Sequence, residues 1–203
     1  MNKKIRTGNA GPTQIGFGCG RLVGGSSFKE SAKLIETALE LGILHFDVAP
    51  SYGFGTAENV LGEVLAGVLD AKIATKVGIA RSPGSGVLSS LKKYITPLVN
   101  SSKTIKSLAL KTLSSRTQRG KFETDFVMSA YEDSLKRLQR SYIDYYLLHS
   151  PVFGDISDSL RVYCNTLLAE ERVKGLGLGF NETLYDENIN FGTVIQHNIG
   201  QLN

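Results

Sequence analysis

Short apolar runs alternate along the chain with longer stretches in which apolar residues recur every three or four positions. The short runs are typical of buried strands and lie at 13–20, 43–48, 72–78, 143–149, 173–180 and 193–198. The longer stretches are typical of amphipathic helices and lie at 28–41, 58–68, 124–138 and 157–171. This alternation predicts an α/β fold in which helices pack outside a parallel sheet.

The first predicted helix carries clear signals at both ends. Ser27 and Glu30 have the spacing of a capping box, in which each side chain accepts a hydrogen bond from the backbone N–H of the other residue. Gly42 favours the left-handed conformation that ends many helices. These signals predict a helix that begins after Ser27 and ends before Gly42.

Two architectures surround a parallel sheet with helices. A doubly wound sheet usually carries a phosphate-binding glycine loop after its first strand, but the segment 16–25 lacks the G-x-G-x-x-G spacing. A (β/α)8 TIM barrel has no such requirement, and it builds its site at the carboxyl ends of several strands. We therefore expect a single barrel domain over residues 1–203, incomplete, with about six β/α units present.

The composition is that of a soluble globular domain. Apolar residues make up 41% of the chain and charged residues 21%. No apolar run approaches the roughly 20 residues needed to cross a bilayer, and the basic N-terminus lacks the apolar core of a secretory signal. Cys19 and Cys164 are too few for a disulfide framework or a zinc site. We expect a cytoplasmic protein with neither a membrane nor a metal partner.

Positive charge is concentrated in one segment. Residues 81–122 contain nine Lys or Arg and no Asp or Glu, so the remainder carries a formal net charge of −5, because the whole chain carries +4. We interpret the segment as an insertion, either a solvated loop or a lid that attracts an anionic substrate or cofactor. Between its ends Tyr94 is the one aromatic residue, which offers no stacking platform for bases, so we expect no nucleic-acid binding.

Four polar residues lie at or just beyond the ends of three predicted strands. Asp47 ends the second strand and is followed five residues later by Tyr52, while Lys76 and His149 end the third and fourth strands. Because the carboxyl ends of barrel strands meet at one rim, these side chains are expected to lie together. Each residue alone has a simpler interpretation: Asp47 as a turn former, Lys76 as a solvated tip, Tyr52 as a packing residue and His149 as a loop cap. Their joint placement favours one site.

An acid, a phenol, an amine and an imidazole on one rim favour proton transfer. A free tyrosine has a pKa of about 10, and a nearby ammonium such as that of Lys76 is expected to lower it. Asp47 would hold Lys76, and His149 would orient a carbonyl oxygen. No side chain readily donates hydride, so a carbonyl reduction at this rim requires a nicotinamide or similar cofactor.

Several segments resemble the aldo-keto reductase family. Residues 46–65 (FDVAPSYGFGTAENVLGEVL) are similar to its active-site segment, and the AP-x-YG-x-G-x-AE form is most similar to the branch of sugar and pyridoxal dehydrogenases. Residues 75–78 resemble its lysine strand and 134–151 its helix–strand–histidine segment. Residues 171–180 and 194–198 resemble its fifth and sixth strand segments.

The resemblance implies a barrel that binds NADP(H), or sometimes NAD(H), without a Rossmann loop. It implies that Tyr52 is the acid/base, that Lys76 and Asp47 tune it, and that His149 orients the carbonyl. Gln196 would contact the nicotinamide carboxamide. The family often has Ser-Asn at the end of strand five, where this chain has Gly179 and only a shifted Asn181.

The implied function is the interconversion of an aldehyde or ketone, such as a sugar, and its alcohol by an NAD(P)(H)-dependent oxidoreductase. The substrate would be a small carbonyl or alcohol molecule. Strands seven and eight of the family barrel, with their pyrophosphate-binding loops, have no counterpart before Asn203. We therefore expect a barrel truncated at its carboxyl end, and an inactive or regulatory fragment with a reduced cofactor site is the alternative.

Overall fold

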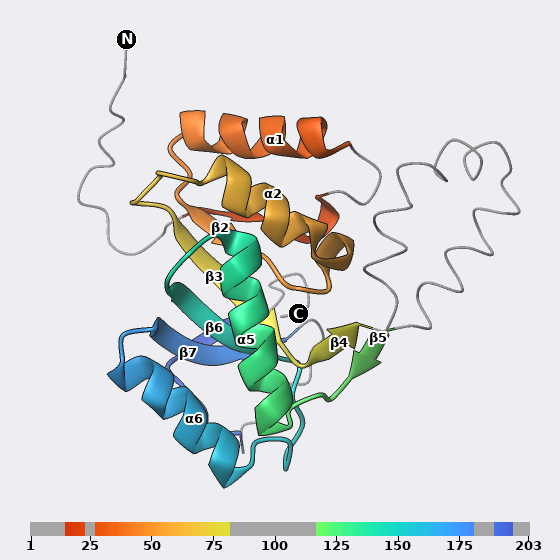
Figure 1. Ribbon diagram of the computed structural model, residues 1–203, viewed down its shortest axis with the longest axis vertical. Helices are drawn as coiled ribbons and strands as arrows, with labels where there is room; N and C mark the ends of the chain where they lie inside the picture. Colours follow the sequence, from red (N-terminus) through yellow and green to blue (C-terminus); the bar gives the residue numbers. More distant parts are fainter. Residues whose placement is uncertain (1–14, 23–26, 82–116, 181–188, 197–203) are drawn as a thin grey trace, which may run out of the picture.

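The structure, a computed structural model, describes residues 15–22, 27–81, 117–180 and 189–196. Within them, six parallel strands form one curved sheet in the order β1-β2-β3-β6-β7-β8 (Figure 1). These strands are β1 (Gly16–Gly18), β2 (His45–Asp47), β3 (Lys72–Val77), β6 (Ile143–His149), β7 (Val173–Gly179) and β8 (Val194–Gln196). The sheet is part of a (β/α)8 barrel, which confirms the predicted fold class.

Helices lie on the outer side of the sheet (Figure 1). They are α1 (Phe28–Glu40), α2 (Thr56–Val64), α5 (Thr124–Leu138) and α6 (Asp158–Ala169). The predicted capping box is confirmed, because Ser27 Oγ accepts from Glu30 N at 3.2 Å and the Glu30 carboxylate accepts from Ser27 N at 2.6 Å. Ser157 caps α6 in the same way, accepting from Leu160 N at 3.2 Å.

The second helix differs from the expectation in its bounds. It was predicted over 58–68, but α2 begins at Thr56 and ends at Val64. Gly55, with φ +84, ends the preceding turn and lets the helix start early. Gly67, with φ +82, then turns the chain toward β3 and shortens the helix at its other end.

The two ends of the predicted insertion form an antiparallel ribbon. Strand β4 (Ile79–Arg81) pairs with β5 (Thr117–Arg119). Gly78, with φ +114, directs the chain out of β3, and the Phe122 ring packs so closely over it that a Cβ would lie 2.2 Å from a ring carbon. Residues 82–116, which hold most of the insertion, lie outside the described residues, so its role as a loop or a lid stays a prediction.

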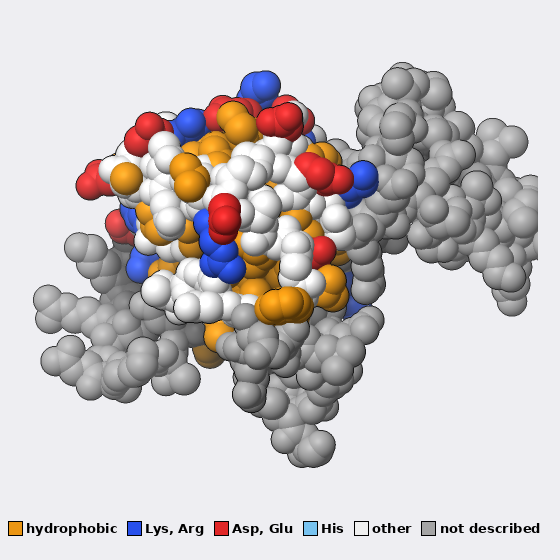
Figure 2. All heavy atoms as spheres, turned by 90° about the horizontal axis from the view of Figure 1, so that it is seen from below, with side chains coloured by type: hydrophobic (Ala, Val, Ile, Leu, Met, Phe, Trp, Pro, Cys, Tyr) orange, Lys and Arg blue, Asp and Glu red, His pale blue; other side chains and the backbone are white. Residues whose placement is uncertain are grey.

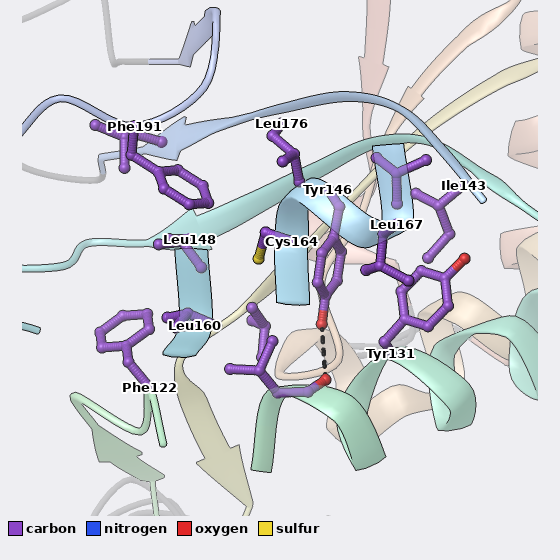
Figure 3. Close-up of a cluster of buried hydrophobic side chains, with 14 of the residues drawn as sticks. Phe122, Tyr131, Ile143, Tyr146, Leu148, Leu160, Cys164, Leu167, Leu176 and Phe191 are labelled. Carbon is purple, nitrogen blue, oxygen red and sulfur yellow. Dashed lines mark hydrogen bonds between the residues drawn. The ribbon is translucent and has the colours of Figure 1, made fainter. Parts of the chain in front are cut away.

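The core consists of two clusters of buried side chains. One lies between β1–β3 and helices α1 and α2, and the other between β6–β7 and helices α5 and α6. In the second cluster the rings of Tyr131 and Tyr146 meet edge to face, with centroids 5.4 Å apart (Figure 3). Tyr146 Oη donates to Val127 O at 3.4 Å, and Tyr131 Oη donates to Arg172 O at 2.7 Å. Both buried hydroxyls are therefore satisfied, and the cluster supports the strand that ends at His149.

The surface of the described part mixes charge and apolar groups. Viewed from below, acidic and basic side chains and exposed hydrophobic side chains lie among one another (Figure 2). Across the described ranges, none of the helices has both the length and the apolar character needed to cross a membrane.

Candidate active site

The carboxyl ends of β2, β3 and β6 meet at one edge of the sheet. Asp47 is the last residue of β2, His149 is the last residue of β6, and Lys76 is the second-last residue of β3. Tyr52 begins the 3-10 turn η2 (Tyr52–Gly55), five residues after Asp47. The structure thus brings the four residues predicted from the sequence to one rim.

Lys76 lies at the centre of the site and is only 2% exposed. Its Nζ donates a hydrogen bond to Asp47 Oδ1. The same atom lies 3.4 Å from Val48 O and 3.4 Å from Tyr52 Oη, and 5.2 Å from the centroid of the Tyr52 ring. The ammonium of Lys76 therefore links Asp47, at the end of the neighbouring strand β2, to the phenol of Tyr52.

The charge of Lys76 is maintained by a balance between burial and pairing. Burial lowers the pKa of its ammonium, because a desolvated cation is disfavoured, and the Asp47 carboxylate opposes this fall. Removal of one member of such a pair leaves an uncompensated charge in a largely dry environment. Asp47 thus favours the charged form of Lys76 beside Tyr52.

The pKa of Tyr52 differs from the sequence-based expectation. Lys76 was expected to lower it, but burial of the phenol, and then the negative charge of Asp47 and the nearby Cys19, raise the pKa to about 12. The expectation was wrong because it left out desolvation and the carboxylate that offsets the ammonium. A phenol with this pKa keeps its proton at neutral pH.

His149 closes the site on the side of β6. It is 2% exposed, and its ring lies edge-on to the Tyr52 ring with centroids 6.4 Å apart. The chain then turns sharply, because Ser150 has φ +55 and is followed by Pro151. Ser150 N donates to Gly179 O at 2.7 Å, which ties the end of β6 to the end of β7.

The predicted nicotinamide contacts lie on β7 and β8, next to Lys76. Gly179 and Gln196 are partners in the parallel register, and a Cβ on Gly179 would lie 3.4 Å from Gln196 Oε1 and 3.4 Å from Lys76 Cε. Gln196 Oε1 is buried, and the described residues offer it no hydrogen-bond partner. Asn181, the third predicted contact, lies outside the described residues.

Several residues support the site from behind. Cys19 is completely buried, and burial together with Asp47 raises the pKa of its thiol, which is therefore inert packing beside the acid. Gly20 lies beside Tyr52, where a Cβ would make an ordinary contact at 3.8 Å from that ring. Glu58 and Thr75 are fully buried and bonded to each other. Sequence reasoning missed this hydrogen bond, because 17 positions separate Glu58 from Thr75 and no local spacing signals the contact.

Comparison with known proteins gives a family for this chain. Residues 14–178 match the family described as the Aldo/keto reductase family. Among curated proteins, the chain is 28% identical over 145 residues to aldo-keto reductase YhdN of Bacillus subtilis (strain 168), covering 68% of this chain and 34% of that protein. It is 27% identical over 177 residues to the uncharacterized oxidoreductase YqkF of the same organism, covering 87% of this chain and 45% of that protein.

Solved structures agree on the architecture. The holo form of aldo-keto reductase AKR11C1 from Bacillus halodurans superposes with a TM-score of 0.61 at 26% identity, over 82% of this chain and 46% of that one. An aldo/keto reductase from Klebsiella pneumoniae, solved in complex with NADP and acetate, has the same fold with a TM-score of 0.58 at 20% identity, over 86% and 47%. The chain therefore spans less than half the length of these relatives.

Proposed function

The chain belongs to the aldo/keto reductase family, and from this premise we propose that it is a nicotinamide-dependent oxidoreductase. The proposed reaction interconverts an aldehyde or ketone and the corresponding alcohol. The single observation that carries the proposal is the contact of Tyr52 Oη with a buried ammonium, 3.4 Å away, which is itself paired with Asp47. A protonated phenol beside a fixed cation is suited to deliver a proton and to stabilise the phenolate that remains.

Each rim residue has one role in this reaction. When bound, the nicotinamide supplies a hydride to the carbonyl carbon. Tyr52 donates its phenolic proton to the carbonyl oxygen, and Lys76 stabilises the phenolate. Asp47 holds Lys76, while His149 orients the carbonyl oxygen through a hydrogen bond. In the direction of oxidation, the Tyr52 phenolate accepts the proton of the alcohol.

Gln196 and Gly179 fit the amide end of the nicotinamide. Gln196 Oε1 is a buried acceptor for which the described part of the chain supplies no donor, and a carboxamide NH2 group would satisfy it. The missing side chain at Gly179 leaves space beside that oxygen. We propose NADP as the cofactor, with NAD as the alternative, and Asn181 as a further contact.

The substitution Tyr52→Phe tests the proposal. It removes the proton donor but keeps the ring, so turnover of a small test aldehyde with NADPH or NADH should fall by roughly 10²- to 10⁴-fold. Cofactor affinity, measured by fluorescence titration, should stay within about twofold, because Tyr52 makes no proposed cofactor contact. The matched control is Tyr163→Phe, which removes a partly buried hydroxyl on α6 and should leave turnover unchanged.

Two outcomes would change the conclusion. Equal turnover by the wild type and by Tyr52→Phe would contradict the assigned acid. Cofactor binding without turnover in the wild type would favour the alternative function, an inactive or regulatory barrel fragment. The chain spans less than half the length of the relatives named above.

A further inference from the structure

A buried carboxylate lies behind the rim, on the outer side of the sheet. Glu58, in the first turn of α2, is completely buried and accepts two hydrogen bonds. Its Oε1 accepts from Thr75 Oγ1 at 2.8 Å, and its Oε2 accepts from Arg137 Nε at 2.6 Å. A buried carboxylate is costly unless it is paired and hydrogen-bonded, and here both oxygens have a donor.

The first bond connects Glu58 to the strand of the central lysine. Thr75 is fully buried and precedes Lys76 directly on β3. Successive side chains of a strand point to opposite faces of the sheet, so Thr75 points out toward α2 while Lys76 points in toward Asp47. A displacement of Thr75 therefore displaces Lys76.

The turn that carries Tyr52 is continuous with the helix that carries Glu58. The turn η2 ends at Gly55 and α2 begins at Thr56. Thr56 Oγ1 donates to Gly53 O at 2.6 Å, which joins the turn to the first residue of the helix. The hydrogen bond that holds Glu58 of α2 against Thr75 of β3 therefore sets the position of Tyr52 relative to Lys76.

The second bond connects the same carboxylate to α5, the helix that leads into β6. Arg137 also donates through Nη2 to Ser134 Oγ at 3.2 Å. The two helices touch at Gly62, where a Cβ would lie 2.3 Å from Arg137 O. Glu58 thus joins α2, β3 and α5, which position Tyr52, Lys76 and, through β6, His149.

We propose that Glu58 is a positioning residue, which holds the phenol of Tyr52 and the ammonium of Lys76 at their working separation through its bonds to Thr75 and Arg137. Its effect on turnover rests on the proposed function, whereas its effect on the geometry does not. Small displacements of reacting groups slow a reaction strongly, since a misplacement of about 1 Å can lower the rate roughly 10²-fold.

Thr75→Val is the sharpest test, because it keeps the shape of the side chain and removes only the hydroxyl that binds Glu58. We expect kcat for the test aldehyde to fall by about tenfold while KM changes by less than about twofold, since substrate binding is not altered. Thr75→Ser keeps the hydroxyl and should retain turnover. Ser134→Ala removes another buried hydroxyl of the cluster but leaves the Arg137 Nε bond to Glu58, and should also retain it.

A second measurement is independent of turnover. In the full chain labelled with 13C-tyrosine, the Tyr52 signal, assigned by its absence in Tyr52→Phe, should shift or broaden in Thr75→Val but not in Thr75→Ser or Ser134→Ala. An unchanged Tyr52 signal in Thr75→Val would overturn the positioning role, whatever the turnover. A moved signal in a chain that shows no turnover would uphold that role and count against the proposed reaction.

Discussion

The β3 side and the β8 edge of the same sheet are built differently. On β3 the outward side chains Ile73, Thr75 and Val77 are at most 3% exposed, and the inward side chain is the paired ammonium of Lys76. On β8 the outward Ile195 is 48% exposed. The inward positions of neighbouring β7 include glycines, among them Gly177 and Gly179.

The difference separates the two halves of the proposed reaction. On the side of the proposed proton transfer, Lys76 and Asp47 are on strands covered by helices, and two ion pairs, each with a buried member, tie the elements together. Among the residues that would hold the nicotinamide, Gln196 has a buried acceptor oxygen for which the described ranges supply no hydrogen-bond partner.

Adding one methyl group on each side should produce a clear contrast in stability. Gly62→Ala places a Cβ 2.3 Å from Arg137 O, between two packed helices, so the free energy of unfolding should fall by about 1–3 kcal/mol. Gly177→Ala places a Cβ only 1.9 Å from Val194 O, on the edge strand β8. Its cost is limited by the smaller free energy of detaching that strand, so the loss should be less than 1 kcal/mol.

Urea unfolding gives both free energies, and hydrogen exchange locates the change. Gly177→Ala should remove protection of the β8 amides while those of β3 and β6 keep theirs. A cooperative loss of several kcal/mol in Gly177→Ala would show that β8 is as firmly integrated as β3, and the contrast between the two sides would disappear.

The covered half of the molecule was also the half that the sequence predicted best. The strand predicted over 143–149 is β6, and the strand predicted over 72–78 is β3, because continuous apolar runs of this length are a strong local signal. The rim residues followed from strand ends and from the family resemblance. Helix bounds were less certain, as at Gly55 and Gly67, where left-handed glycines shift both ends of α2.

Contacts between distant segments could not be predicted from spacing. The ribbon of β4 and β5 joins two segments, 79–81 and 117–119, which have three residues each and are too short to show a strand periodicity. The bond of Glu58 to Arg137 spans 79 positions. The raised pKa of Tyr52 depends on how deeply the folded chain buries it, which no residue spacing encodes.

Unfolding at alkaline pH should be sensitive to two tyrosines, Tyr52 in η2 and Tyr163 on α6. Burial raises the pKa of Tyr52 and of Tyr163 on α6 to about 12, against about 10 in an unfolded chain. The stability that each contributes is fully present below pH 10 and is lost as the pH rises toward 12, because the unfolded chain loses the proton first. Between pH 10 and 12, each Tyr→Phe variant should therefore release about one proton fewer on unfolding than the wild type does.

The same two variants, Tyr52→Phe and Tyr163→Phe, also separate the effect on stability from the effect on the proposed chemistry. Both variants should flatten the loss of stability between pH 10 and 12, but only Tyr52→Phe should abolish turnover. A wild-type reduction rate that fell between pH 7 and 9 with the titration of Tyr52 would contradict the raised pKa and restore the original expectation that Lys76 lowers it.

The smallest effect is expected at the outer face of the edge strand. Ile195→Thr changes a side chain that is 48% exposed, so the free energy of unfolding should change by less than about 0.5 kcal/mol. The same substitution at Ile73, which is 2% exposed on β3, should cost roughly 2–4 kcal/mol, because it removes a buried methyl group and buries a hydroxyl. If thermal or urea unfolding instead gave Ile195→Thr a cost near that of Ile73→Thr, the outer face of β8 would be covered in solution. The outer faces of β3 and β8 would then be equally covered, and the contrast between the two sides would rest on the inward glycines alone.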